Sequence, residues 1–212
     1  LRKKPFVHPG LKNVTSVTNV ILKKDVLLHF PYHSFNSVID LLREAAIDPD
    51  VVSIKITCYR LADRSKIINT LTNAVRNGKQ VTVVLELRAR FDEEANLEYK
   101  EELEDAGVKV LFGVHNMKVH AKICLIKKRV NNKTTHYGFV STGNLNEKTA
   151  TVYSDTCLLT SDRNIMADVN RIFSYLEQPK TRIHLLQQCN TLIVSPTGMR
   201  RQLLQMINKE IK

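Results

Sequence analysis

The sequence of 212 residues is poor in the residues that staple or anchor a chain: it has no tryptophan, six prolines and four cysteines. The cysteines (Cys58, Cys124, Cys157 and Cys189) form no Cys-x-x-Cys pair, which argues against a zinc site. Three of them lie in apolar runs, so we expect reduced, buried thiols of a cytosolic protein. No apolar run is long enough to cross a bilayer, and no signal-peptide pattern opens the sequence.

Acidic side chains are scarce relative to basic ones. There are 21 Asp and Glu against 32 Lys and Arg, which gives a net charge of +11. An excess of this size favours a polyanionic partner, such as nucleic acid, a membrane surface or another phosphate polymer. A basic surface that only keeps the protein soluble fits the charge equally well.

The two ends of the sequence suggest a piece of a longer protein. It begins LRKKPF without methionine and ends LLQMINKEIK, within the pattern of an amphipathic helix. Residues 1–24 are basic and polar, and we interpret them as a linker leading into a domain. Residues 25–180 are predicted to form that domain, and residues 181–212 the start of a next one, with a new strand and helix.

Within residues 25–180, strand and helix patterns alternate over most of the length. This alternation is typical of an α/β domain with a largely parallel sheet. Helices are expected to start at Ser34 and to end at Asn77-Gly78 and Gly107. Strands 118–126 and 136–143, joined by a charged turn over 127–135, add an antiparallel hairpin.

Arginines end two strands at equivalent places. Arg60 ends the strand VVSIKITCYR, and Arg88 and Arg90 end the strand VTVVLELRAR. In α/β sheets ligands bind beyond the carboxyl ends of strands, where a guanidinium beside a helix N-terminus suits a phosphate. Pairing with nearby acids such as Glu86 or Glu93 is the alternative, and the repetition favours phosphate.

The stretch NMKVHAKICLI places His120 and Lys122 two residues apart, on one face of a predicted strand. A second stretch, STGNLNEKTA, offers a tight turn followed by the amides of Asn144 and Asn146. Imidazole can accept a phosphoryl group, ammonium can neutralise its oxygens, and amides can orient either one. A single histidine in a strand is usually a core residue, but this companion stretch favours a pocket.

These motifs resemble two related families. His-x-Lys with Gly-x-Asn is the core of the phospholipase D superfamily pattern, which has an aspartate where this sequence has Lys127. The stretches ELRARFDEEAN, VHAKICLI and GNLNEKTA are more similar to the polyphosphate kinase family that works through a phosphohistidine, from about Lys24 to the C-terminus. The resemblance implies an α/β fold, a phospholipase D-like mixed sheet with helices on both faces. Residues 25–180 would be the first of two such domains.

The resemblance also implies a reaction, the reversible transfer of the terminal phosphate of ATP to inorganic polyphosphate with Mg²⁺. His120 is the implied phosphohistidine, and Tyr153 matches a nucleotide-contacting residue. Arg60 and Arg90 match residues assigned to the magnesium-phosphate site. A guanidinium has no lone pair to give a metal, so we expect these arginines to contact phosphates that carry the ion. The carboxylates of Asp92, Glu93 and Asp155 are better candidate ligands.

The expected partners are ATP or ADP, polyphosphate, the remaining domains of a full-length enzyme and further copies in a homo-oligomer. Nucleic acid is not expected. The expected location is the cytoplasm, with peripheral membrane association left open, and the piece is expected to be inactive alone. Two alternatives stay open: a phospholipase D-type phosphodiesterase or nuclease, and a non-catalytic polyanion-binding module in which His120 is structural.

Overall fold

The computed structural model describes residues 4–59, 61–62, 65–86 and 93–211, with the side chains of 93–96 excepted. The chain divides into two compact units, residues 1–162 and 163–212, and each is described by itself. The first unit contains the sheet. Its elements are η1 (Pro9–Leu11), α1 (Val17–Ile21), β1 (Val26–Phe30), α2 (Asn36–Ile47), β2 (Val51–Cys58), α3 (Lys66–Arg76), β3 (Gln80–Leu85), α4 (Glu93–Asp105), β4 (Lys109–Phe112), β5 (Lys122–Val130), β6 (Lys133–Ser141), η2 (Thr149–Thr151) and β7 (Asp155–Thr160).

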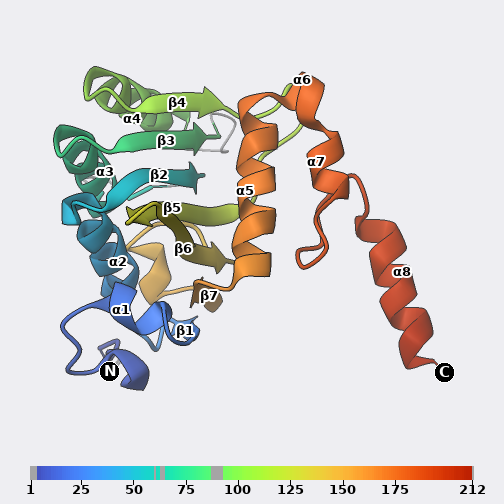
Figure 1. Cartoon of the computed structure of the whole chain (residues 1–212), viewed down its shortest axis with the longest axis horizontal. Coiled ribbons are helices and arrows are strands. Elements are labelled where there is room, and N and C mark those ends of the chain that lie inside the picture. The colour runs from blue at the N-terminus through green and yellow to red at the C-terminus, as the bar shows by residue number, and fades with distance from the viewer. Residues whose placement is uncertain (1–3, 60, 63–64, 87–92, 212) are drawn as a thin grey trace. The chain divides into compact units, whose positions relative to one another are not determined.

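The strands form one mixed sheet in the order β1-β7-β6-β5-β2-β3-β4 (Figure 1). β2, β3 and β4 pair in parallel, and the other neighbours pair antiparallel. The predicted α/β class, with a parallel part and an antiparallel hairpin, is confirmed. The register aligns Cys58 with Leu85 and Lys122 with Ser141. The last residues of β2, β3 and β6 therefore lie at the same end of the sheet as the first residue of β5, and we call this the site end.

The core lies between helices of this unit and alternate residues of its strands. On β2 the inward residues are Ile54, Ile56 and Cys58, as expected for a strand with a side-chain period of two. They share one cluster with buried residues of α1, α2, α3 and α4, which Figure 1 shows beside the sheet. All four cysteines of the chain are free and buried, as predicted.

The β5–β6 hairpin is longer than predicted. β5 continues through Lys127–Val130, and the connection shrinks to Asn131 and Asn132. Both asparagines have positive φ, 48° and 62°, which suits a two-residue hairpin turn because asparagine tolerates this region. The charged residues had indicated a turn, but the exposed end of a strand accepts charged side chains as well.

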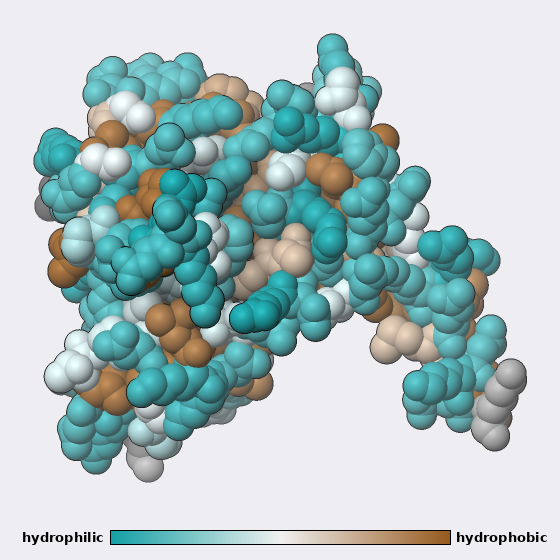
Figure 2. Space-filling view, viewed as in Figure 1, coloured by the Kyte–Doolittle hydropathy of each residue, from teal (hydrophilic) through white to brown (hydrophobic). Residues whose placement is uncertain are grey.

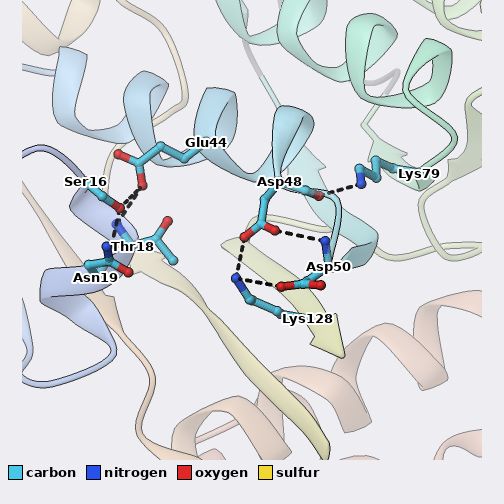
Figure 3. A network of polar contacts seen from close by, with 8 residues as sticks. All are labelled: Ser16, Thr18, Asn19, Glu44, Asp48, Asp50, Lys79 and Lys128. Atoms are coloured by element: carbon cyan, nitrogen blue, oxygen red, sulfur yellow. Dashed lines mark hydrogen bonds and ion pairs between the residues drawn. The ribbon is translucent and has the colours of Figure 1, made fainter. Parts of the chain in front are cut away.

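Residues before β1 also belong to the core of the first unit. Leu11, Val17 and Ile21 are buried there, although residues 1–24 were interpreted as a linker. The carboxylate of Glu44 on α2 fixes this segment. It accepts a hydrogen bond from the backbone N–H of Thr18 at 2.8 Å (Figure 3), and another from the backbone N–H of Val17 at 2.7 Å. A carboxylate at a helix N-terminus satisfies donors that have no partner within the helix.

The second unit is helical over the residues described. It comprises α5 (Arg163–Glu177), α6 (Pro179–Arg182), α7 (His184–Gln187) and α8 (Met199–Glu210). The strand predicted within TLIVSP does not form. The carboxylate of Asp168, which is 1% exposed, accepts hydrogen bonds from three successive backbone N–H groups at residues 190–192. These bonds fix a loop where the apolar residues of TLIVSP had indicated a strand. Among the described residues, no helix meets the length and apolarity that a membrane span requires.

A partly buried ion pair lies at the opposite end of β5 from Lys122. Lys128 donates a hydrogen bond to Asp48 at 2.6 Å, and Asp50 lies 3.6 Å from the same ammonium (Figure 3). Burial alone would raise the pKa of Asp48, but the hydrogen bond and charge of Lys128 outweigh it, so this pKa is lowered. The pair therefore stabilises the folded state above the unfolded pKa of the carboxyl, and this contribution is lost as the pH falls through the folded pKa.

We expect Lys128→Met to lower the free energy of unfolding by about 1 kcal/mol at pH 7, because it removes one partner of a partly buried, charged hydrogen bond. Urea unfolding of both proteins from pH 7 to pH 2 measures this difference. The difference in free energy of unfolding should shrink on acidification, because a protonated Asp48 no longer attracts the ammonium of Lys128. A gap that stays constant to the lowest pH would show that the pair does not stabilise the fold.

Candidate active site

The candidate site is organised around Tyr59, the first residue after β2. Its ring meets the imidazole of His120 edge-on, with centroids 5.0 Å apart and planes at 81°. The ammonium nitrogen of Lys122 lies 5.2 Å from the centroid of the same ring. One aromatic residue thus holds the two predicted catalytic side chains close together at the site end. Tyr59 was not predicted as a site residue from the sequence, although its neighbour Arg60 was.

His120 and Lys122 are not placed as two equivalent residues on one strand face, as the alternation predicted. β5 begins only at Lys122, and His120 lies in the segment before it. The histidine is exposed, whereas Lys122 is 5% exposed and donates a hydrogen bond from Nζ to the backbone carbonyl of His120 at 2.7 Å. A buried ammonium is tolerated because that carbonyl and the ring of Tyr59 replace part of its hydration.

The Gly-Asn-x-Asn stretch follows β6 at the same end of the sheet. The side-chain oxygen of Asn144 is buried and accepts no hydrogen bond from the described residues. The side-chain oxygen of Asn146 accepts bonds from the N–H groups of Lys148 and Thr149, both at 3.0 Å. Asn146 therefore holds its own loop together, while Asn144 presents a buried acceptor with no donor among the described residues.

The N-terminus of α3 is occupied by a carboxylate. Glu147 accepts a hydrogen bond from the backbone N–H of Lys66 at 2.8 Å, next to the N-cap Ser65. A carboxylate suits the positive end of a helix, as the phosphate expected here after Arg60 would. Through this bond the helix end anchors the Gly-Asn-x-Asn loop.

Gly143 is required by a close neighbour. A Cβ added to it would lie 2.6 Å from the carboxylate of Asp155, closer than side-chain carbons approach oxygen. Asp155 in turn accepts a hydrogen bond from the hydroxyl of Thr142 at 2.8 Å, and that hydroxyl accepts one from the N–H of Thr156. The missing side chain thus lets the loop after β6 pack on the first residue of β7.

The remaining predicted residues divide into two groups. Tyr153 lies just before β7 with 63% of its surface exposed, open to a ligand from solvent. The other candidates lie outside the described residues, or have side chains outside them: Arg60, Arg88, Arg90, Asp92 and Glu93.

For a metal ion, the described residues contain no group of three or more His, Cys, Asp or Glu side chains suited to hold one. Asp155 is the described carboxylate among the candidate ligands, and it lies at the site end, where β7 begins. Magnesium usually keeps several waters and binds through one or two carboxylates together with substrate phosphates. The carboxylate of Asp155 is compatible with this kind of binding.

Residues 16–182 match the family described as polyphosphate kinase C-terminal domain 1. A polyphosphate kinase of Vibrio vulnificus is 46% identical over 207 residues, which cover 98% of this chain and 29% of that protein. The polyphosphate kinase of Escherichia coli K12 is 46% identical over 193 residues, covering 91% of this chain and 28% of that protein. The chain therefore spans less than a third of the length of these relatives.

Solved structures give the same relation. The crystal structure of polyphosphate kinase from Porphyromonas gingivalis superposes with a TM-score of 0.84 and 38% identity, over all of this chain and 34% of that one. Nuc from Salmonella typhimurium, a phospholipase D family member, superposes with a TM-score of 0.54 and 15% identity over 73% of this chain and 91% of that one. The second match shows a shared fold alone and confirms the predicted phospholipase D-like sheet.

Proposed function

Because the chain belongs to the polyphosphate kinase C-terminal domain 1 family, we propose that it supplies the phosphohistidine part of an ATP:polyphosphate phosphotransferase. The observation that carries this proposal is the placement of an exposed imidazole and a buried ammonium against one ring, that of Tyr59. An exposed nucleophile can be reached by ATP and then by a polymer end. A fixed cation beside it can stabilise the oxygens of the transferred group.

The reaction would proceed in two balanced steps. A ring nitrogen of neutral His120 attacks the γ-phosphorus of ATP, an N–P bond forms, and the bond from phosphorus to the bridging oxygen breaks to release ADP. A terminal phosphate oxygen of polyphosphate then attacks phospho-His120, the N–P bond breaks, and the polymer leaves one unit longer. Lys122 would neutralise charge on the moving group in both steps.

Asn144 would orient the histidine. Its buried side-chain oxygen lacks a donor among the described residues, and an oxygen acceptor suits an imidazole N–H rather than a phosphate oxygen. An imidazole whose one nitrogen donates to this oxygen would keep the other nitrogen deprotonated for attack. We assign Asn146 to the loop, whose backbone it binds.

Magnesium, Arg60, Arg90 and Tyr153 complete the proposed site. When bound, Mg²⁺ would shield the phosphates of ATP, with Asp155 as the described carboxylate able to contribute a ligand or bind a metal-bound water. The two arginines would contact the phosphates and Tyr153 the nucleotide, by resemblance to the family. We also propose that the chain's partners are the remaining domains of the full-length enzyme and further copies in a homo-oligomer. We propose the cytoplasm as its location, because a reducing compartment keeps cysteines free.

The basic excess would serve the polymer. With a net charge of +11, the chain attracts polyanions, and the face in Figure 2 is largely hydrophilic with small, scattered hydrophobic patches. We expect a steep loss of polyphosphate affinity with salt. The phosphodiesterase alternative is disfavoured, because Lys127 replaces the aspartate of the phospholipase D pattern. Lys127 lies on β5 opposite His136, a histidine whose pKa is lowered by burial and by the charges of Lys127 and Lys55.

The test uses the protein at the full length of its relatives, with γ-labelled ATP and Mg²⁺. Label should appear first on the protein, stable to alkali and labile to acid, and then in polyphosphate of increasing length. Label released only as inorganic phosphate, or hydrolysis of DNA or phospholipid without polymer growth, would refute the proposal. Polyphosphate binding with no phosphoprotein would favour the non-catalytic alternative.

Tyr59 gives a separate prediction. Tyr59→Leu should slow phosphoprotein formation about tenfold, since a cation–π contact with a desolvated ammonium is worth up to about 2 kcal/mol. Tyr59→Phe keeps the ring and should stay close to the wild type. Rapid-quench measurement of labelled protein compares the three. Equal rates for Leu and Phe would show that the ring has no role.

A further inference from the structure

The backbone around His120 is fixed by side chains in places where the β-ladder no longer reaches. The antiparallel pairing of β2 with β5 ends at Ile56 opposite Cys124. The next residue of β2, Thr57, continues it with its side chain. Its hydroxyl donates a hydrogen bond to the carbonyl of Ala121 at 2.7 Å and accepts one from the N–H of Ile123 at 3.0 Å.

A second side chain holds the other flank of the histidine. Glu86, the first residue after β3, accepts a hydrogen bond from the N–H of Val119 at 2.9 Å. Its own N–H donates to the carbonyl of Cys58, which ties it to β2. Thr57 is 2% exposed and Glu86 is 4% exposed, and the hydrogen bonds above point both side chains at the backbone around His120.

These bonds alternate with the two candidate catalytic residues. The held groups belong to Val119, Ala121 and Ile123, and between them lie His120 and Lys122. The chain can leave the ladder at this point without leaving buried backbone groups unsatisfied, so His120 can stand exposed on a fixed backbone. A hydroxyl suits the place of Thr57 because it donates and accepts at once.

We infer that Thr57 and Glu86 are positioning residues for phosphoryl transfer: they act as a backbone clamp that sets where the imidazole of His120 stands relative to the ammonium of Lys122. This inference rests on the proposed function. In-line attack needs the nucleophile held within a fraction of an ångström, and a displacement of about 1 Å costs about 100-fold in rate. The clamp would fix the position of the imidazole through the backbone, without contact to the substrate.

The decisive variant is Thr57→Val, which keeps the shape and removes both hydrogen bonds. We expect the single-turnover rate of phosphohistidine formation to fall about 10- to 100-fold, with the apparent affinity for ATP changed less than about threefold. Thr57→Ser keeps the hydroxyl and should recover most of the rate. Amide hydrogen exchange at Ile123 should be faster in Thr57→Val alone.

Thr160→Val is the matched control. Thr160 is also buried on a strand, and its hydroxyl also donates once, to Asp25 at 2.6 Å, and accepts once, from the N–H of Asp162 at 2.9 Å. It lies at the end of β7 away from the site. Its loss should lower the melting temperature about as much as the loss of Thr57, and leave the transfer rate near that of the wild type.

Variants of Glu86 provide an independent test of the clamp. Glu86→Gln retains an oxygen for the N–H of Val119 and should remain within about fivefold of the wild type, whereas Glu86→Leu should lose at least tenfold. If Thr57→Val does not fold, this pair decides the question. Wild-type rates in Thr57→Val, or an equal loss in Thr160→Val, would overturn the clamp while leaving the proposed function intact. Absence of phosphohistidine in the wild type would overturn both.

Discussion

His120→Asn should abolish the labelled phosphoprotein and reduce polyphosphate synthesis by more than about 1,000-fold, because no other group would carry the phosphoryl unit between donor and acceptor. Asparagine keeps a planar polar side chain of similar reach, so the fold should be retained. The exposed position of His120 supports this expectation, since no buried cavity is created. The measurement is rapid-quench labelling of the full-length protein with γ-labelled ATP, with circular dichroism to confirm folding.

His115→Asn is the matched control for this variant. His115 is exposed in the same connection between β4 and β5, five residues before His120, and is not assigned a role in the site. Its variant should be labelled at the wild-type rate. Label that persists in His120→Asn with the same resistance to alkali would place the phosphoryl carrier elsewhere and remove the basis of the proposed mechanism.

Much of the fold could be predicted from local sequence. The alternation of strands and helices is correct, and Gly78 and Gly107 follow α3 and α4 with φ of 78° and 84°, as their glycines indicated. These signals are local: apolar periodicity and residues that tolerate positive φ. The strand predicted at TLIVSP failed because a strand needs a neighbour to pair with, and a single sequence does not show that Asp168 binds this backbone instead.

Only those residues of the candidate site that carry reactive side chains could be predicted from the sequence. His120 and Lys122 were recognised because an imidazole and an ammonium are reactive groups. Tyr59, Thr57 and Glu86 were not recognised, because a tyrosine, a threonine and a glutamate occur at many places with ordinary structural roles. Their importance comes from where the strand pairing of β2 and β5 stops, and a sequence pattern does not specify that residue.

Lys122→Met should slow phosphoryl transfer about 100- to 1,000-fold, the usual cost of removing one fixed donor from a site where charge develops. Methionine fills nearly the same volume, so packing beside Tyr59 is preserved and the lost property is the charge. The defect should appear in the rate of labelling at saturating ATP rather than in ATP affinity, because Lys122 would act on the transferred group in the transition state.

Two controls separate this effect from loss of stability or of charge in general. Lys128→Met removes an ammonium from the same strand at its far end, where it pairs with Asp48, and should lower stability without slowing transfer. Lys122→Arg keeps the charge but needs more room than a side chain that is 5% exposed allows. It should therefore transfer faster than Lys122→Met and slower than the wild type. If Met and Arg at position 122 were equally active, the charge of this lysine would have no part in the reaction, and Lys122 would only hold the carbonyl of His120.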